Sequence, residues 1–243
     1  MIKLFRDKES LSIGAAGLFI ECAEESIEKK NAFTVALSGG STPKRTYEIL
    51  ASPPYRDRIN WEKTNIFWGD ERCVSICDER SNCRMAFDTL LDNVPVPREN
   101  LHPILCEDNP EKGAAEYEKL LRKFFRGRPP AFDLVLLGLG ENGHTASLFP
   151  ETGILQESNK LASSLHVQED EYHRVSLTAN TINQAAVIAF LVSGASKASV
   201  LRDVLEGPQA PRRLPAQLIR PVRGELIWMI DRSAGSLLAS APQ

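Results

Sequence analysis

The chain has 243 residues, of which 42% are hydrophobic and 25% are charged. This is the composition of an ordinary globular protein with a sizeable core. Its formal net charge of −3 gives no general basic field, so we expect no nucleic-acid partner. An anionic ligand would have to be held by a local cluster of cations. We find no linker, and we therefore expect a single domain over residues 1–243.

The sequence shows no secretion or membrane signal. Met1–Ser10 is charged and lacks an apolar core, so it is not a signal peptide. The longest apolar run, Ala185–Val192, is only as long as a strand. We expect a cytoplasmic protein with no membrane partner. The five cysteines, at positions 22, 73, 77, 83 and 106, lack the paired spacing of a zinc site, so we expect free thiols and no metal.

Helical and strand patterns alternate along the chain. Apolar residues at helical spacing predict helices over 10–29, 82–92, 110–126 and 196–205. Thr42 and Pro43 predict the start of a further helix, as its N-cap and first residue. Short apolar runs predict strands over 33–37, 66–68, 134–137, 175–177, 186–192 and 226–230. This alternation predicts an α/β protein, with a mostly parallel sheet and helices on both faces.

The turn after the first predicted strand has the features of an anion site. Gly39 and Gly40 free the backbone after Ser38, and Ser41 and Thr42 begin a helix. Main-chain N–H groups at a helix N-terminus, two hydroxyls and the helix dipole together favour a phosphate. The alternative is a plain strand-to-helix turn with a good cap. The glycine spacing is not that of a P-loop.

Two carboxylates and an arginine follow the strand that ends at Trp68. Asp70, Glu71 and Arg72 lie where open α/β sheets bind ligands. Neighbouring side chains in an extended segment point apart, so we expect one carboxylate to face a pocket. We favour Asp70 and expect Glu71 to be structural. The alternative is a solvated loop.

Three further cations lie near predicted ligand-binding edges. Arg84 is in the first turn of a helix, where the dipole does not favour a cation. Arg174 begins a predicted strand, and Lys197 begins a predicted helix. Each alone is typical of a solvated surface. Together with Arg72 they could form a basic pocket for a small phosphorylated metabolite.

The segment Phe132–Pro150 carries the strongest single candidate. A buried strand leads into Gly138, Gly140 and Gly143 and then His144. The glycines also fit a dinucleotide fingerprint, but no strand ending in Asp or Glu follows about 20 positions on, and Pro150 leaves no room for the long helix. We expect Thr145 to cap a short helix. His144 is well suited to act as a general base near neutral pH, although a lone histidine is more often structural.

The motifs together resemble the 6-phosphogluconolactonase family, within the glucosamine/galactosamine-6-phosphate isomerase superfamily. They are SGGSTP at 38–43, GDER at 69–72, SNCRMA at 81–86, GENGHTASLFP at 140–150, RVSLT at 174–178 and SGASKASVL at 193–201. The resemblance implies a three-layer, Rossmann-like α/β fold with no metal or nucleotide cofactor. It implies hydrolysis of 6-phospho-D-glucono-1,5-lactone to 6-phospho-D-gluconate, in the oxidative pentose phosphate pathway.

The resemblance also implies roles for particular residues. His144 would be the general base that activates water, and Asp70 the acidic pocket residue. The substrate contacts would be Gly39, Gly40, Ser41, Thr42, Arg72, Arg84, Arg174 and Lys197. Many members of the family have Asp where this chain has Asn142, and an amide can orient His144 but brings no charge.

Three alternatives stay open at this point. They are an amino-sugar-phosphate isomerase or deaminase of the same fold, an NAD(P)-dependent oxidoreductase, and a non-catalytic sugar-phosphate sensor. The resemblance favours the lactonases over the deaminases, because the residues after His144, TASLFP, are typical of the lactonases and the deaminases have a different continuation. We expect the protein to act as a monomer.

Overall fold

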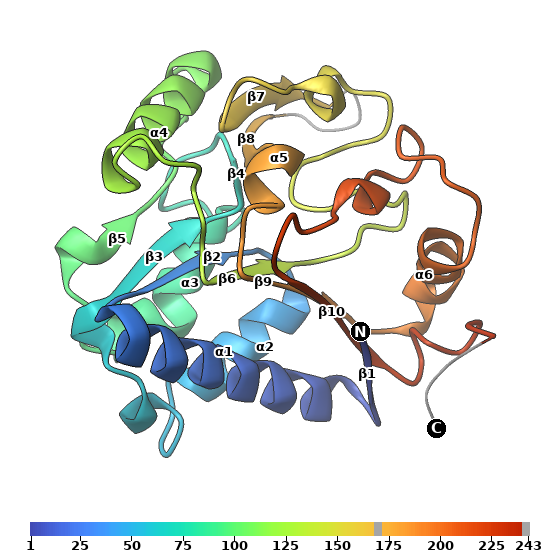
Figure 1. Ribbon diagram of the computed structural model, residues 1–243, viewed down its shortest axis with the longest axis horizontal. Coiled ribbons are helices and arrows are strands. Elements are labelled where there is room, and N and C mark those ends of the chain that lie inside the picture. The colour runs from blue at the N-terminus through green and yellow to red at the C-terminus, as the bar shows by residue number, and fades with distance from the viewer. Residues whose placement is uncertain (168–171, 240–243) are drawn as a thin grey trace.

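The computed structural model describes residues 1–167 and 172–239. Its larger sheet has seven parallel strands in the order β1-β10-β9-β6-β2-β3-β5 (Figure 1). The strands are β1 (Ile2–Phe5), β2 (Phe33–Leu37), β3 (Thr64–Trp68), β5 (Leu101–His102), β6 (Leu134–Leu137), β9 (Val187–Val192) and β10 (Glu225–Asp231). The predicted parallel sheet is confirmed. Strands β1 and β5 were not predicted, because they are short and only partly buried.

The strand order reverses between β2 and β6. From β2 the chain builds outward through β3 and β5, whereas β6, β9 and β10 extend the other side. β2 and β6 pair only at Val35 with Leu134 and at Ala36 with Val135. Beyond that pair, the Tyr47 hydroxyl accepts from the Ser38 N–H at 3.0 Å and donates to the Ser38 carbonyl at 2.9 Å. Because the pairing of β2 with β6 ends there, a crevice opens at this switch point, which is where such sheets bind ligands.

Helices cover both faces of the sheet, as predicted. Helices α1 (Lys8–Lys30) and α2 (Ser41–Leu50) lie on one face, and α4 (Pro110–Phe124) lies on the other (Figure 1). The remaining helices are α3 (Asn82–Thr89), α5 (Ala179–Ile182) and α6 (Ala198–Leu205). Asp7 caps α1 by accepting from the Ser10 N–H at 2.8 Å, which explains why this helix starts before its first apolar residue.

A second, antiparallel sheet lies on the face that carries α4 (Figure 1). Its strands are β4 (Asp70–Arg72), β8 (His173–Leu177) and β7 (Ala162–His166), in the order β4-β8-β7. The register places Asp70 opposite Ser176 and Arg72 opposite Arg174. The sequence predicted only β8, because a strand such as β4 is defined by its pairing and has no apolar periodicity. This sheet brings Arg174 and Arg72 to one place.

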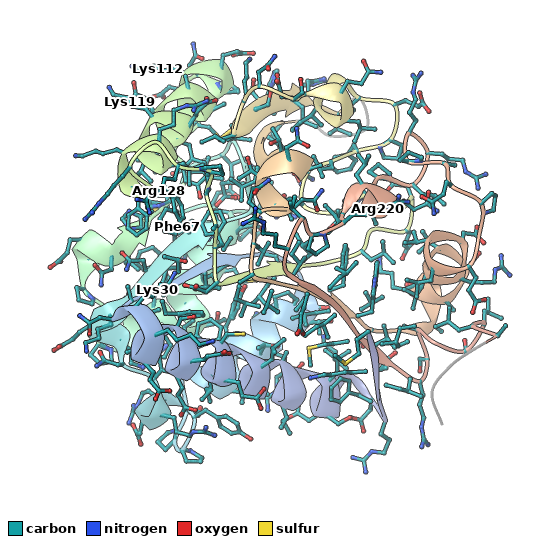
Figure 2. The ribbon with its side chains drawn as sticks, viewed as in Figure 1. Lys30, Phe67, Lys112, Lys119, Arg128 and Arg220 are labelled. Carbon is teal, nitrogen blue, oxygen red and sulfur yellow. A yellow bond between two sulfur atoms is a disulfide. The ribbon has the colours of Figure 1, made fainter. Side chains whose placement is uncertain are left out.

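An aromatic cluster packs α4 and its following loop against the sheet. Phe67 on β3 is labelled in Figure 2. Its ring centroid lies 5.0 Å from that of Phe124 and 5.2 Å from that of Phe132. Phe67 and Phe132 are fully buried, and burying an aromatic side chain of this size contributes about 1.5–3 kcal/mol. This packing fixes β3, and with it the start of the segment that leads to Asp70.

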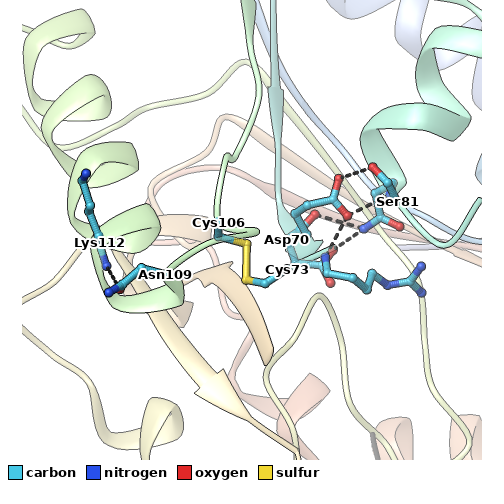
Figure 3. Close-up of a disulfide and its surroundings, with 9 residues drawn as sticks. Asp70, Cys73, Ser81, Cys106, Asn109 and Lys112 are labelled. Carbon is cyan, nitrogen blue, oxygen red and sulfur yellow. Dashed lines mark hydrogen bonds between the residues drawn. A yellow bond between two sulfur atoms is a disulfide. The ribbon is translucent and has the colours of Figure 1, made fainter. Parts of the chain in front are cut away.

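One expectation about the cysteines is wrong. Cys73 and Cys106 form a disulfide with their Cα atoms 4.8 Å apart. Figure 3 shows the bond joining the residue after β4 to the segment ahead of α4, whose first turn is capped by Asn109. A separation of 33 residues gives no pairing signal in the sequence. Cys22, Cys77 and Cys83 are free thiols.

Candidate active site

A cavity of 270 Å³ lies at the switch point between β2 and β6. It is lined from the large sheet by the turns after these two strands, and from the small sheet by β4 and β8. All but three of the predicted site residues line it, the exceptions being Ser41, Thr42 and Arg84. Its lining residues are Ser38, Gly39, Gly40, Asp70, Arg72, Asn82, Gly138, Leu139, Gly140, Glu141, His144, Ala146, Arg174 and Lys197.

The charge of this cavity suits an anion. Arg72, Arg174 and Lys197 reach it from three different elements. A larger hollow of 780 Å³ beside Phe149 is lined by no lysine or arginine of the described residues. Another, of 440 Å³ beside the disulfide, contains Lys112 among four acidic side chains. The switch-point cavity therefore differs from these two hollows in having three cations in its lining.

The turn before α2 presents main-chain donors to the cavity. The helix begins at Ser41 with Gly40 as its N-cap, so the prediction of Thr42 as the cap is wrong. Gly40 has φ +104, which a side chain would disfavour, and no side chain caps the first turn. Thr42 is buried, and Ser41 is exposed. The N–H groups of this turn have no partner inside the helix and can bind an anion.

Two buried polar atoms of the cavity lining lack a protein partner. Within residues 1–167 and 172–239, neither Ser38 Oγ nor Arg72 Nε forms a hydrogen bond. Buried polar groups are otherwise nearly always paired. Their position in the lining is what a polar ligand would require.

His144 is held by a compact glycine turn. The Gly140 N–H donates to the His144 carbonyl at 2.8 Å, and the Gly143 N–H donates to the Gly140 carbonyl at 3.0 Å. The imidazole stacks on Phe149 with centroids 4.2 Å apart. A Cβ on Gly140 would lie 2.1 Å from His144 Nδ1. This glycine is therefore needed because the ring packs directly against its backbone.

The segment after His144 is not a helix, so the prediction of Thr145 as a helix cap is wrong. Thr145 forms an isolated β-bridge with Leu148, and its hydroxyl donates to the Gly138 carbonyl at 2.8 Å. Ala146 has φ +47, a backbone conformation incompatible with a continuing right-handed helix.

Asn142 orients the imidazole. Its Oδ1 accepts from the His144 main-chain N–H at 3.2 Å and lies 2.6 Å from Nδ1. A main-chain N–H can only donate, so the atom facing it is the amide oxygen, and Nδ1 must donate to that same oxygen. The proton therefore lies on Nδ1, and Nε2 carries the basic lone pair. An amide at this position thus fixes the tautomer without a charge.

Asp70 and Glu71 point to opposite sides of β4, as the strand alternation predicts. Asp70 is 6% exposed and lines the cavity. Glu71 accepts from the N–H groups of Asn82 and Cys83 at 2.8 and 2.7 Å. Burial raises the pKa of Glu71, and these donors oppose the shift. Glu71 therefore holds the start of α3, which is a structural contact.

Arg84 lies in the right segment but faces away from the cavity. Its Nε lies 2.7 Å from both carboxylate oxygens of Asp88, one turn along α3. Asn82, two residues earlier, lines the cavity instead, and its Nδ2 donates to the Asp70 carbonyl at 3.0 Å. A Cβ on Gly39 would lie 2.0 Å from Asn82 Oδ1. Within 81–86, the residue that lines the cavity is therefore Asn82 and not the predicted Arg84.

The other two cations are fixed by their surroundings. Arg174 is 8% exposed, and its guanidinium carbon lies 5.1 Å from the ring centroid of Phe149. Lys197 lies 3.6 Å from Glu141. The turn before Lys197 is anchored by Asp231, which accepts from the Gly194 N–H at 3.1 Å. Sequence reasoning missed Asp231, because its partner is on another strand end.

The described residues show no sign of a metal site or a membrane span. No group of three or more His, Cys, Asp or Glu side chains among residues 1–167 and 172–239 could hold a metal ion. No helix in that part of the chain is long and apolar enough to cross a membrane.

Known proteins match this chain along nearly its full length. It is 44% identical to a 6-phosphogluconolactonase of Synechocystis sp. over 218 residues, which cover 88% of each chain. It is 38% identical to a 6-phosphogluconolactonase of Nostoc sp. over 242 residues, 98% of each chain.

Solved structures agree with these matches. The structure of 6-phosphogluconolactonase from Trypanosoma brucei is 28% identical, with a TM-score of 0.86 over 98% of both chains. A monomeric glucosamine-6-phosphate deaminase, 23% identical over 97% of this chain and 99% of its own, shares the fold with a TM-score of 0.81. Residues 6–228 match the family described as glucosamine-6-phosphate isomerases/6-phosphogluconolactonase. The chain belongs to this family.

Proposed function

We propose that this protein hydrolyses 6-phospho-D-glucono-1,5-lactone to 6-phospho-D-gluconate, a step of the oxidative pentose phosphate pathway. The observation that carries the proposal is the single cavity in which an oriented imidazole meets three cations and an uncapped helix N-terminus. The relatives named as 6-phosphogluconolactonases, at 36–44% identity over most of the chain, support the same reaction.

The phosphate of the substrate would be held by the turn before α2 and by the cations. The first-turn N–H groups of α2 and the positive end of its dipole favour a dianion. Arg72 and Arg174 provide planar donors for phosphate or sugar oxygens, and Lys197 adds a compact charge. This anchors the lactone ring near His144, so that binding energy positions the reacting carbon.

Hydrolysis then needs one proton acceptor and one oxyanion stabiliser. His144 Nε2 removes a proton from a water molecule as its oxygen bonds to the C1 carbonyl carbon, and the carbonyl electrons move to oxygen. Main-chain N–H groups or an arginine of the cavity stabilise the oxyanion. When the carbonyl re-forms, the bond from C1 to the ring oxygen breaks and the imidazolium returns the proton to that oxygen. General base action of this kind contributes about 10²–10⁴-fold.

Asp70 contributes a fixed acceptor at the cavity wall. Its Oδ2 accepts from Ser147 Oγ at 2.6 Å, which leaves lone pairs for a sugar hydroxyl. A serine nucleophile is not part of the proposal: Ser147 is fully buried and its hydroxyl is committed to Asp70. Because the steps use only protein acids, bases and hydrogen-bond donors, we propose that no metal or nucleotide cofactor takes part.

The second candidate is an amino-sugar-phosphate isomerase or deaminase. Its support is the shared fold. The purified protein should be incubated separately with freshly prepared lactone and with glucosamine 6-phosphate. We expect acid release from the lactone well above the spontaneous rate, and no ammonia from the amino sugar. Ammonia production without acceleration of lactone opening would overturn the proposal.

We further propose that the chain works as a single-domain monomer in the cytoplasm. The absence of a membrane-spanning helix in the described residues fits this. The Cys73–Cys106 disulfide is an observation against this location, because a reducing compartment such as the cytoplasm keeps most thiols reduced. Light scattering after size exclusion tests the oligomeric state, and a dimer mass would refute the monomer.

A further inference from the structure

Ser147 joins the loop that carries His144 to the small sheet. Ser147 lies three residues after the histidine and is fully buried. Its hydroxyl donates to Asp70 Oδ2 at 2.6 Å, and its main-chain N–H donates to Ser176 Oγ at 3.2 Å. The hydroxyl and the main-chain N–H of this one residue therefore both reach strands of the small sheet.

The two partners of Ser147 form one cross-strand pair. Asp70 on β4 and Ser176 on β8 are directly opposite in the antiparallel ladder. The Ser176 hydroxyl donates its own proton to the Leu177 carbonyl at 2.9 Å, so its lone pairs can accept from Ser147 without conflict. The donors and acceptors of the group are consistent with one another.

The loop needs such an anchor because its own backbone is irregular. It contains Gly140 and Gly143, and Gly143 and Ala146 have positive φ values of 81 and 47. The residues directly after His144 form no helix. Meanwhile Asp70 and the cations Arg72 and Arg174 are placed by the small sheet. The distance from the imidazole to these groups thus depends on how the loop is fastened to that sheet.

We propose that Ser147 is a positioning residue for the hydrolysis, one that fixes His144 relative to Asp70 through the hydroxyl–carboxylate hydrogen bond. The proposal rests on the proposed function. Ser147 touches no substrate, since it does not line the cavity. Its hydrogen bond fixes the orientation of the Asp70 carboxylate. The same bond connects the small sheet, which carries Asp70, to the loop that carries His144.

The test is a double-mutant cycle measured by kcat and KM on fresh lactone. Ser147→Ala removes the hydroxyl but keeps the main-chain bond to Ser176. We expect kcat to fall about tenfold, in line with the loss of a hydrogen bond to a charged group, and KM to change by less than about twofold because the cations are untouched. In an Asp70→Ala background, Ser147→Ala should change kcat by less than about twofold, since its partner is already absent.

Ser12 provides the matched control, because it is another fully buried serine, lies on α1, and its Oγ has no hydrogen-bond partner among the described residues. Ser12→Ala should keep wild-type kcat. Equal kcat in wild type and Ser147→Ala, or an undiminished effect of Ser147→Ala in the Asp70→Ala background, would overturn the positioning role. A wild-type protein that fails to accelerate lactone opening would refute the proposed function itself, and this inference with it.

Discussion

Gly140→Ala should displace His144, the proposed general base, without changing that residue itself. The added Cβ would lie 2.1 Å from both Nδ1 and Cε1 of His144, whereas ordinary van der Waals contacts begin near 3.4 Å. The ring must therefore shift by more than about 1 Å, and a displacement of that size at a reacting group can cost about 10²-fold in rate. The same shift breaks the Nδ1 contact to Asn142, which is 2.6 Å in the native protein.

The expected result is a kcat at least about 10²-fold lower with folding preserved. Gly140 has no positive φ, and the imidazole is half-buried, so the ring can move aside without disrupting the core. Gly17→Ala on α1 is the matched control, because a Cβ there meets nothing within 4 Å and Gly17 is not part of the cavity lining. The assay follows acid release from fresh lactone, with circular dichroism to check folding. Wild-type kcat in Gly140→Ala, or equal losses in both variants, would refute this account of the turn.

Three further predictions test other contacts. Reducing the Cys73–Cys106 bond should lower the free energy of unfolding, measured in urea, by about 4 kcal/mol, the loop-closure value for a separation of 33 residues. The control Cys77→Ser should leave the urea midpoint unchanged, since that thiol is free and exposed. An unchanged midpoint on reduction would contradict the prediction. Asn142→Asp places a carboxylate beside the imidazole and favours its protonated form, so the acid limb of the kcat–pH profile should move to higher pH; an unmoved limb would argue against this contact. Burial lowers the pKa of His102 below its ordinary 6.5, so its contribution to stability is complete above pH 6.5 and is lost as pH falls through the lower folded value; His102→Phe should therefore lose less Tm than wild type between pH 7.5 and 5.5, and equal losses would contradict the assignment.

The sequence was most informative where structure is local. Apolar runs located the strands of the large sheet next to the crevice, and glycine-rich turns at their ends located the cavity. Each of these signals lies within a few residues of the feature that it predicts. The same is true of His144, whose orientation depends on Asn142 two residues earlier.

Features that depend on distant partners could not be predicted. β4 is a strand because it pairs with β8, about a hundred residues later. The Cys73–Cys106 bond and the Asp231 anchor of the turn before Lys197 are of the same kind. Within 81–86 the sequence pointed to Arg84, but Arg84 pairs with Asp88 and Asn82 lines the cavity. Only the three-dimensional packing decides which side of a helix start meets a ligand.

The central claim is that His144 activates the attacking water. The most direct measurement compares kcat on freshly prepared lactone for wild type and His144→Gln, corrected for spontaneous opening. The control is His166→Gln, at an exposed histidine on β7. We expect a loss of about 10²–10⁴-fold for His144→Gln, with the control near wild type. A kcat for His144→Gln within a few-fold of wild type would contradict the account.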